Sequence, residues 1–391
     1  MKKERIVVAM SGGVDSSVSA ALLKAQGYEV IGITMCFNLA DSGRRRPGCC
    51  GLEGIEDARR VAHKLGIRHY VLNMQKELET WVIKDFLKEY IGGRTPNPCV
   101  RCNQYIKFGA LLKKAFSLDA KLLATGHYAR IMKSPSPQPP APSYVLKKAK
   151  DMQKDQSYFL YRLNQEQLKH TLFPLGNYTK GEVRNLAKDF SLPVADKLAS
   201  QDICFLPNVD YRRFIEHRLH RLSRSTIFYI AGSRFAGKNT DYTDIMPGPV
   251  VDSQGNVLGR HKGIAFYTIG QREGLGIAKG HPLYITNIDA KNNEIVVGTK
   301  EEACRSEFLV QEPHFILEAP KKKVEVKVKI RYNHKEEPAE VAPIGNKIRV
   351  KFLRPQFAIT PGQSAVFYDR DTVLGGGIID KALDKDGKKR I

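Results

Sequence analysis

An apolar strand pattern runs directly into a glycine- and serine-rich turn near the start of the chain. Residues 5–10 (RIVVAM) have the pattern of a short buried strand, and residues 15–26 have that of a helix. Between them lie Ser11, Gly12, Gly13 and Val14. Two adjacent glycines allow a tight turn and a close approach of the backbone to a ligand. A strand, a tight turn and a helix in this order restrict the first part of the chain to a layered α/β fold.

The same alternation continues over the first third of the chain. Strand patterns cover residues 30–35, 69–72 and 121–125, and an amphipathic helix pattern covers residues 55–65. Strands separated by helices of this length predict a doubly wound parallel sheet. Ligands bind at the carboxyl ends of the strands in such sheets. The pattern therefore predicts a ligand site at the turn that follows the first strand.

The second half of the chain has a different pattern. After residues 202–210, short strands with glycine punctuation replace the helices. Apolar residues alternate with Lys and Arg over residues 324–332, and further strand patterns follow. We expect a catalytic domain over residues 1–208, a small central domain over 209–285 and a C-terminal β-barrel over 286–382. The proline-rich residues 134–143 are interpreted as an exposed insertion in the first domain.

Charge, apolar runs and cysteine count narrow the class of protein. The 391 residues include 63 Lys and Arg against 41 Asp and Glu, and the net charge of +22 favours a polyanionic partner. No apolar run is long enough to cross a bilayer and no secretory signal is visible, so we expect a cytoplasmic protein. The seven cysteines, an odd number, favour metal binding or catalysis over a disulfide framework.

The turn at residues 11–17 has the chemistry of a phosphate site. Backbone N–H groups at a helix N-terminus attract an anion, and Ser11, Ser16 and Ser17 add hydroxyl donors. Bare phosphate would repel Asp15, so its expected role is to hold Mg²⁺ against pyrophosphate. Two glycines alone would also suit an ordinary capped helix. The whole string, however, resembles the PP-loop of the ATP-pyrophosphatase family, whose members adenylate a carbonyl oxygen.

Three cysteines are candidates for chemistry. Cys99 and Cys102 precede a helix pattern over residues 104–115, and Cys204 lies far along the chain. A helix N-terminus and the neighbouring Arg101 would lower the pKa of a thiol. Three interpretations stay open at this point: a structural zinc site, a thioredoxin-like pair and sulfur transfer. We call Cys99, Cys102 and Cys204 the cysteine set.

Six motifs in order resemble the tRNA-specific 2-thiouridylase family (MnmA/TrmU) over nearly the whole chain. They are residues 11–17, 95–103 (TPNPCVRCN), 124–130 (ATGHYAR), 154–160 (KDQSYFL), 200–205 (SQDICF) and 267–276 (YTIGQREGLG). The resemblance implies an enzyme that uses ATP and Mg²⁺ to adenylate the C2 oxygen of the wobble uridine of tRNA, U34, and then replaces that oxygen with sulfur. AMP and pyrophosphate are released. The uridine must be flipped out of the anticodon stack to reach the site.

The resemblance also implies roles for single residues. The ATP-binding positions are Ala9, Met10, Ser11, Gly12, Gly13, Val14, Asp15, Ser16, Met35 and Gly126. Cys102 matches the nucleophile and Cys204 the cysteine that carries the persulfide. The positions that face the target base are Asn97, Pro98 and Cys99. Those that touch the tRNA are His127, Lys154, Asp155, Gln156, Arg331, Tyr332 and Gln363.

Cys99 departs from the family pattern. Many members have Asp at this position, where an acid–base role is proposed, and a cysteine does not supply carboxylate chemistry. The cysteine set could instead bind a [4Fe–4S] cluster with one iron open for sulfide. A persulfide relay is the other interpretation, in which Cys204 delivers the sulfur and Cys102 releases it by forming a disulfide. Cys49 and Cys50, beside three arginines at residues 44–46, are interpreted as part of a basic mobile loop.

The partners that the resemblance implies are the anticodon arm of tRNA, held by the central domain and the barrel, and a sulfur donor. The donor is expected to be a cysteine desulfurase or a sulfur-relay protein. We expect a monomer that binds one tRNA and no membrane. Two other functions stay open: another PP-loop ligase of the amidotransferase type that acts on a small molecule, and a non-enzymatic, metal-dependent RNA-binding protein.

Overall fold

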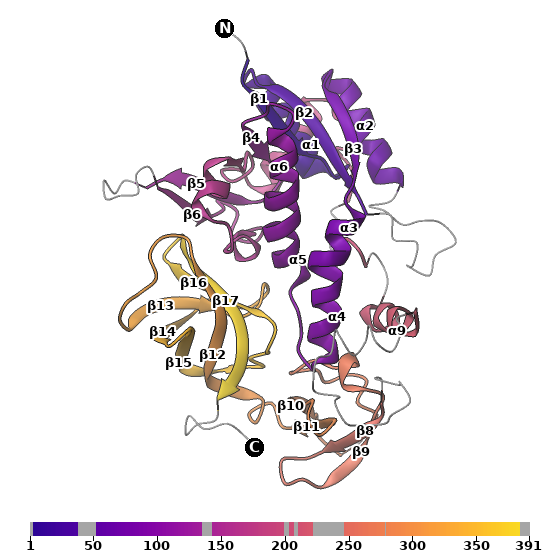
Figure 1. Cartoon of the computed structure of the whole chain (residues 1–391), viewed down its shortest axis with the longest axis vertical. Helices are drawn as coiled ribbons and strands as arrows, with labels where there is room; N and C mark the ends of the chain where they lie inside the picture. The colour runs from indigo at the N-terminus through magenta and orange to yellow at the C-terminus, as the bar shows by residue number, and fades with distance from the viewer. Residues whose placement is uncertain are drawn as a thin grey trace.

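The computed structural model describes residues 3–37, 52–134, 143–198, 203–206, 210–221, 246–277 and 279–383. Three sheets organise these residues: an α/β layer, a small central unit and a β-barrel (Figure 1). The predicted fold class is therefore confirmed. None of the helices within these ranges has the length and apolar character needed to span a membrane.

A five-stranded parallel sheet forms the first layer. Its order is β3-β2-β1-β4-β7. The strands are β1 (Arg5–Ala9), β2 (Glu29–Cys36), β3 (Arg68–Asn73), β4 (Leu122–Ala124) and β7 (Thr171–Leu172). The chain begins at the centre, moves outward to β3 and returns to β4 on the other side of β1, so the sheet is doubly wound. The carboxyl ends of β1 and β4 therefore lie side by side.

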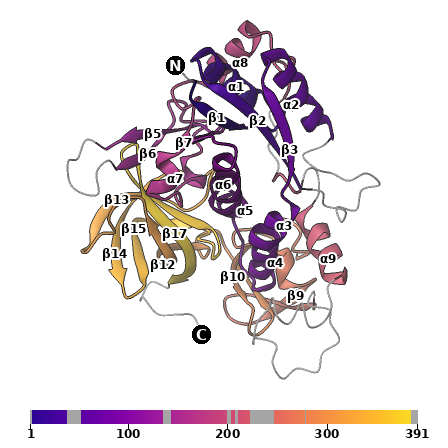
Figure 2. The same cartoon turned by 45° about the horizontal axis from the view of Figure 1, so that its top comes forward.

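Helices cover both faces of this sheet. Ile6 and Val8 of β1 pack into one core with α1 (Val14–Ala25), α2 (Leu52–Leu65) and α8 (Lys180–Asp189), which lie together in Figure 2. Val7 packs into the other core, with the helical segments that follow β3. Successive residues of a strand point to opposite faces. The unbroken apolar run of β1 therefore reflects burial on both sides.

Two helical segments pass beside the barrel. The first consists of α3 (Gln75–Leu78), η1 (Glu79–Ile83) and α4 (Lys84–Ile91), and the second of α5 (Pro98–Arg101), η2 (Cys102–Leu111) and α6 (Leu112–Phe116). The prediction that the second helix starts at residue 104 is wrong. It starts earlier because the Asn97 Oδ1 accepts a hydrogen bond from the Val100 N–H at 3.3 Å and Pro98 occupies the first turn. Cys99 and Cys102 therefore lie within the helix.

Six antiparallel strands close into a barrel. The order is β12-β15-β14-β13-β16-β17, and β17 pairs back to β12. The strands are β12 (Cys304–Phe315), β13 (Val324–Lys329), β14 (Glu337–Ile344), β15 (Lys347–Phe357), β16 (Ser364–Asp369) and β17 (Thr372–Leu383). The hairpin of β5 (Ala129–Lys133) and β6 (Tyr144–Lys148) joins this sheet through β6 and β17. Residues 135–142 of the predicted insertion lie outside the described ranges.

A four-stranded sheet forms the central unit, in the order β10-β11-β8-β9. Its strands are β8 (Gly248–Val251), β9 (Val257–His261), β10 (Tyr284–Asp289) and β11 (Glu294–Gly298). The domain junction predicted between residues 285 and 286 falls inside β10, which pairs with β11 of the same sheet. We propose that the barrel domain begins after Gly298. The remaining short elements are η3 (Ser157–Phe159), α7 (Gln165–Lys169) and η5 (Ile264–Phe266).

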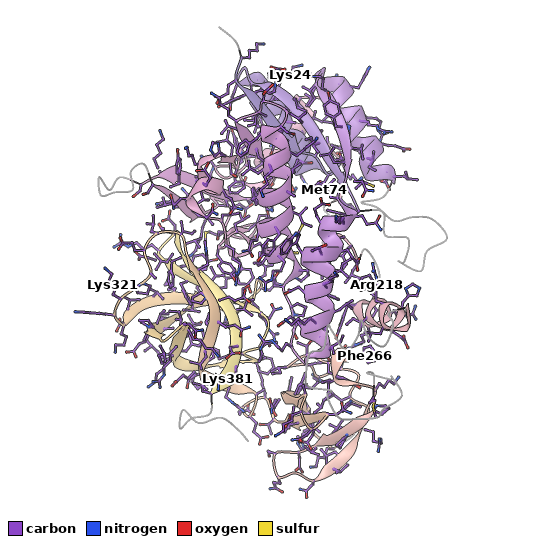
Figure 3. All side chains as sticks on the ribbon, viewed as in Figure 1. Lys24, Met74, Arg218, Phe266, Lys321 and Lys381 are labelled. Atoms are coloured by element: carbon purple, nitrogen blue, oxygen red, sulfur yellow. The ribbon has the colours of Figure 1, made fainter. Side chains whose placement is uncertain are left out.

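Helix α9 (Tyr211–Arg221) occupies a region where the sequence pattern predicted only short strands, and that prediction is wrong. Its buried apolar residues are Phe214, Ile215 and Leu219. They recur at helical spacing, so one face of α9 is covered. Arg218 pairs with Glu79 of η1 at 3.0 Å, and the Tyr211 hydroxyl donates to the Phe266 carbonyl at 3.0 Å (Figure 3). These contacts hold α9 between the first helical segment and η5.

The barrel holds the loop that leads into α5. The Thr95 N–H donates to the Pro361 carbonyl at 2.9 Å. The Gln363 side-chain amide donates to the carbonyls of Thr95 and Pro96 at 3.0 and 2.9 Å. Gly362 lies so close that a Cβ there would stand 2.7 Å from the Thr95 carbonyl oxygen. The backbone just before α5 is therefore fixed from the barrel side.

We predict that Gly362→Ala weakens this docking. Gly362 has a φ of +92° and no room for a Cβ, so strain and overlap should together lower the free energy of unfolding by about 3 kcal/mol. Gly345→Ala is the matched control, because Gly345 has a φ of +56° and open space around its Cβ position, and should cost about 1–2 kcal/mol. Urea denaturation measures both. Equal losses would show that contact with Thr95 contributes nothing.

Candidate active site

The turn after β1 is shaped by a close contact with α2. Gly12 has a φ of +73°, and a Cβ there would lie 2.1 Å from the carbonyl oxygen of Gly54. The Ser11 N–H donates to Ser16 Oγ at 3.2 Å, and Ser17 Oγ donates to the Gly13 carbonyl at 2.8 Å. Only glycine fits at position 12, since both the φ and the approach of α2 exclude a side chain. The turn therefore leads directly into the N-terminus of α1, where backbone N–H groups favour an anion.

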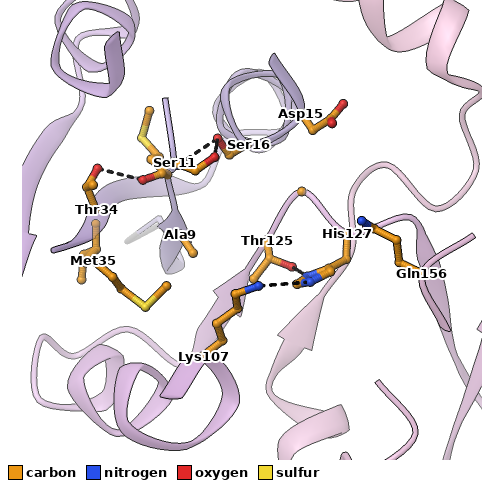
Figure 4. Close-up of a pocket in the computed structure, with 13 residues that line it drawn as sticks. Ala9, Ser11, Asp15, Ser16, Thr34, Met35, Lys107, Thr125, His127 and Gln156 are labelled. Carbon is orange, nitrogen blue, oxygen red and sulfur yellow. Dashed lines mark hydrogen bonds between the residues drawn. The ribbon is translucent and has the colours of Figure 1, made fainter. Parts of the chain in front are cut away.

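A cavity of about 210 Å³ lies at the carboxyl ends of β1 and β4 (Figure 4). The predicted ATP residues that line it are Ala9, Met10, Ser11, Asp15, Ser16, Met35 and Gly126. Gly12, Gly13 and Val14 shape the turn behind them. His127 and Gln156, expected to face tRNA, also line the cavity. Sequence reasoning missed four further lining residues, which are Ile33, Thr34, Lys107 and Thr125.

Asp15 is held from two sides. Its Oδ1 accepts hydrogen bonds from the Tyr128 hydroxyl at 2.8 Å and from the Lys180 ammonium at 2.5 Å. Burial and the neighbouring Asp15 carboxylate both raise the pKa of Tyr128, so its hydroxyl stays protonated and acts as a donor. Gly126 packs against the backbone of Asp15 and Ser16, where a Cβ would come within 2.8 Å. The Asp15 side chain therefore has a fixed position at the edge of the cavity.

His127 is a neutral, internally bonded histidine. Its Nδ1 lies 2.6 Å from Thr125 Oγ1, and its Nε2 lies 3.4 Å from the Lys107 ammonium (Figure 4). An ammonium group only donates, so Nε2 must accept and the ring proton must be on Nδ1. Burial, and then the charge of Lys107, hold the pKa of His127 well below its usual value. The histidine therefore orients Lys107 without adding charge.

The structure brings the cysteine set together. Cys102 is buried, Cys99 is half-buried and Cys204 is exposed. The Cys102 thiol donates a hydrogen bond to Cys204, which lowers the pKa of Cys204 to about 7 and raises that of Cys102 well above its usual value. Burial raises the pKa of Cys99 to about 11. Cys204 is therefore the thiol of the set that ionises most readily.

Arg101 does not act on these thiols as the sequence predicted. Its guanidinium pairs with Asp85 at 3.3 Å and with Glu312 of the barrel at 3.2 Å. Because these two carboxylates neutralise the guanidinium, the charge of Arg101 is compensated within the protein. The cation whose charge lowers the pKa of all three thiols is Lys107.

Comparison with known proteins assigns the chain to a family. Residues 4–208 match the model described as a tRNA methyl transferase HUP domain, residues 240–299 a tRNA methyl transferase PRC-barrel domain, and residues 305–379 an aminomethyltransferase beta-barrel domain. The tRNA-specific 2-thiouridylase MnmA 1 of Caldanaerobacter subterraneus subsp. tengcongensis is 50% identical over 97% of this chain and 98% of its own length. MnmA of Halothermothrix orenii is 48% identical over 96% of this chain and 99% of its own length. The chain belongs to the tRNA-specific 2-thiouridylase family.

The descriptions of the domain models refer to methyl transfer, whereas the names of the relatives refer to thiolation. A cysteine set beside a PP-loop suits the 2-thiouridylase family, because sulfur chemistry uses thiols. Among solved structures, a 4-thiouridine synthetase–RNA complex with bound ATP is 16% identical over 55% of this chain and 50% of that chain. Its TM-score of 0.33 is too low to carry an argument.

Several positions that the 2-thiouridylase resemblance assigned to tRNA are bonded within the protein. The Asp155 carboxylate is buried and accepts hydrogen bonds from the Ala149 N–H and from Ser157. Arg331 donates to the Ile269 carbonyl at 2.9 Å and to Thr360. These two side chains join segments of the protein, so a role for them in tRNA binding stays a prediction.

The remaining tRNA positions differ in their surroundings. Lys154 is exposed. The Gln156 Oε1 accepts from the Tyr128 N–H at 3.0 Å at the edge of the cavity. The Tyr332 ring packs on Phe159 with centroids 4.5 Å apart. Gln363 holds the loop before α5, and Asn97 and Pro98 begin that helix. Cys49, Cys50 and residues 44–46 lie outside the described ranges.

We predict that the stability of this 2-thiouridylase falls as the pH drops below about 6.5, the value for an unfolded histidine. The pKa of His127 is depressed in the folded state, so the unfolded chain binds the proton first and acid favours unfolding. One such histidine contributes up to about 1.4 kcal/mol per pH unit.

Urea denaturation at pH 7.5 and 5.5 measures this loss. His127→Gln should reduce the difference between the two pH values, because glutamine does not titrate. His281→Gln is the control, since His281 is exposed and lies outside the cavity. An unchanged pH dependence in His127→Gln would contradict the assignment of a buried neutral imidazole.

Proposed function

We propose that this chain is an ATP-dependent tRNA-uridine 2-sulfurtransferase that converts the wobble uridine, U34, to 2-thiouridine. One observation carries the proposal: the helical segment η2 begins with Cys102 and also places Lys107 in the wall of the PP-loop cavity, so one segment joins the nucleotide site to the cysteine set. Membership in the 2-thiouridylase family agrees with it. The small-molecule ligase and the non-enzymatic RNA-binding protein are therefore not favoured.

The first half-reaction uses the turn after β1. The C2 oxygen of the uridine attacks the α-phosphorus of ATP, the bond to the β-phosphate breaks, and the N3 proton of the base is lost. The N–H groups at the start of α1, together with Ser11 and Ser16, bind the phosphates. Pyrophosphate leaves and an adenylated base remains. The reaction therefore stores the energy of ATP in a C2–O bond that sulfur can replace.

The residues fit a magnesium ion that is held mainly by ATP. Mg²⁺ is usually bound by one or two carboxylates together with substrate phosphates. Asp15 is the one carboxylate among the cavity-lining residues that the structure describes, and its two protein donors both occupy Oδ1. We propose that Asp15 holds the ion. When bound, Mg²⁺ neutralises charge on the departing pyrophosphate.

The second half-reaction uses the exposed and the buried cysteine in turn. The Cys204 thiolate attacks the sulfane sulfur of a persulfide donor, which leaves as a thiol, and Cys204 becomes a persulfide. The terminal sulfur attacks C2, and AMP departs with the electron pair of the C2–O bond. Cys102 then attacks the Cys204 sulfur and breaks its bond to the transferred sulfur, which stays on C2. The Cys102 proton passes to N3 of the base, and a Cys102–Cys204 disulfide forms. A dithiol reductant supplies two electrons to restore both thiols.

The contacts of the cysteine set favour the relay over a [4Fe–4S] cluster. The relay needs Cys102 and Cys204 side by side, and each of these two thiols shifts the pKa of the other. Across the described ranges, no group of three His, Cys, Asp or Glu side chains is placed to hold a metal ion. The relay is therefore the proposed mechanism, and Cys99 takes no step in it.

The proposed partners follow from the chemistry of the reaction. The anticodon arm of tRNA is the substrate, and the net charge of +22 suits a polyanion. A cysteine desulfurase or a sulfur-relay protein is the proposed donor, since Cys204 is exposed to it. We propose a monomer that acts on tRNA in the cytoplasm.

Thiolation of tRNA by anaerobically purified protein, supplied with ATP, Mg²⁺ and a persulfide donor, tests this function. We predict that Cys102→Ser and Cys204→Ser lose thiolation by about 10³-fold or more, because each removes a reacting sulfur. Pyrophosphate release that depends on tRNA should persist in both. Cys304→Ser is the control, since Cys304 lies in β12 outside the set.

Iron and acid-labile sulfide, measured on the same preparations, decide between relay and cluster. The relay predicts full activity without iron and a tolerated Cys99→Ser. Activity that requires iron and is lost in all three cysteine variants would instead establish the cluster. No thiolation by the wild type with any sulfur source would overturn the proposed function.

A further inference from the structure

Lys107 occupies an unusual place between two sites. It lies on η2, one helical turn beyond Cys102, and its side chain is half-buried in the wall of the cavity (Figure 4). The ammonium lies 3.4 Å from His127 Nε2. Cys102 begins the same helical segment, η2, and the charge of Lys107 acts on the pKa of each thiol of the cysteine set. Lys107 therefore faces the space in which the adenylated base must meet the sulfur.

No carboxylate neutralises this ammonium. Among the residues that the structure describes, Lys107 forms no ion pair, and the one acidic residue that lines the cavity is Asp15. Asp15 is already paired with Lys180 at 2.5 Å. His127, held neutral, offers one acceptor atom and no charge. A half-buried cation without a counter-charge is costly unless an anion joins it. Apart from the Cys204 thiol when it ionises, the counter-charge must come from a ligand, and a phosphate supplies it.

Two lysines, Lys107 in the cavity wall and Lys180 bonded to Asp15, are placed for different phosphates. Lys180 reaches Asp15, beside the start of α1, where the turn binds the part of ATP that leaves as pyrophosphate. Lys107 reaches the cavity from the opposite wall, near Met35 and Thr125 (Figure 4). The phosphate that remains after pyrophosphate leaves is the one joined to the base. Lys107 is therefore placed for the α-phosphate rather than for pyrophosphate.

We propose that Lys107 is a catalytic residue that donates hydrogen bonds to the α-phosphate of the adenylated uridine and stabilises AMP as it leaves. This role rests on the proposed function. As sulfur adds to C2, the C2–O bond breaks and its electron pair moves onto the phosphate oxygen. The positive charge of Lys107 offsets the added negative charge on the phosphate. His127 orients the ammonium by accepting one of its three N–H bonds, which leaves two for phosphate oxygens.

Three variants test this role in the full chain, with tRNA, ATP, Mg²⁺ and a persulfide donor. Lys107→Met keeps the length of the side chain but removes the charge and should slow single-turnover thiolation by about 10²–10³-fold, the usual effect of losing one donor to a developing anion. Lys107→Arg keeps the charge and should recover most of this loss. Lys113→Met is the control, because Lys113 is exposed on α6 and lies outside the cavity. It should thiolate like the wild type.

Two further readouts separate catalysis from packing. In Lys107→Met the Kd for tRNA should stay within about twofold and the melting temperature should be unchanged, while labelled AMP on tRNA accumulates relative to the thiolated product. Thiolation by Lys107→Met within threefold of wild type overturns the proposal. Equal losses in Lys107→Met and Lys107→Arg together with a lowered melting temperature also overturn it. If the wild type itself does not thiolate, the proposed function fails, and this role fails with it.

Discussion

The docking of one barrel loop onto the backbone before α5 is the contact on which the site depends. Thr95 is bonded through both its N–H and its carbonyl, to Pro361 and Gln363 respectively. This leaves Asn97 free to cap the helix, and the cap in turn decides where the helix begins. The position of Cys99 and Cys102 therefore depends on residues more than two hundred and fifty positions away in the sequence. Contacts from the barrel thus help to set the geometry of these two cysteines.

An ionic network of two buried or half-buried arginines and one exposed carboxylate strengthens the same junction. Arg101, which lies between the two cysteines of the helix, and Arg162 both bond to the Glu312 carboxylate, at 3.2 and 3.1 Å. Burial alone would raise the pKa of Glu312, but the two arginines hold it below its usual value. Glu312 also has a φ of +47°, a strained conformation for a residue with a side chain. The strain persists because breaking the network would leave two half-paired guanidinium groups at the interface. The second helical segment is thus held to the barrel at both its first turn and the loop before it.

Features of the fold and site that depend on neighbouring residues in the sequence could be predicted from it, whereas those that depend on tertiary contacts could not. Local pattern was enough for the strand, turn and helix around Gly12, because φ and the close approach of α2 both require glycine there. It failed for Arg101, which lies next to the thiols in sequence but whose charge is taken by Asp85 and Glu312. It also missed Lys107, since a lysine in a helical pattern is usually solvated and only the tertiary fold shows that no acid accompanies it. Gln363 and Arg331 matched family positions, yet their hydrogen bonds to Thr95 and Ile269 follow from packing between domains.

In the proposed relay, the order of events in sulfur transfer follows from an asymmetry between two like side chains. One hydrogen bond makes Cys204 the acceptor and Cys102 the donor, so their pKa values move in opposite directions. Cys204, exposed and with a pKa of about 7, is ready to receive sulfur from outside. Cys102, buried and protonated, stays inert until its partner has become a persulfide and no longer accepts that proton as a thiolate. Because the buried thiol acts last, the disulfide forms only after the sulfur has been handed to the base. The direction of transfer is thus built into burial and one shared proton rather than into a difference between the residues themselves.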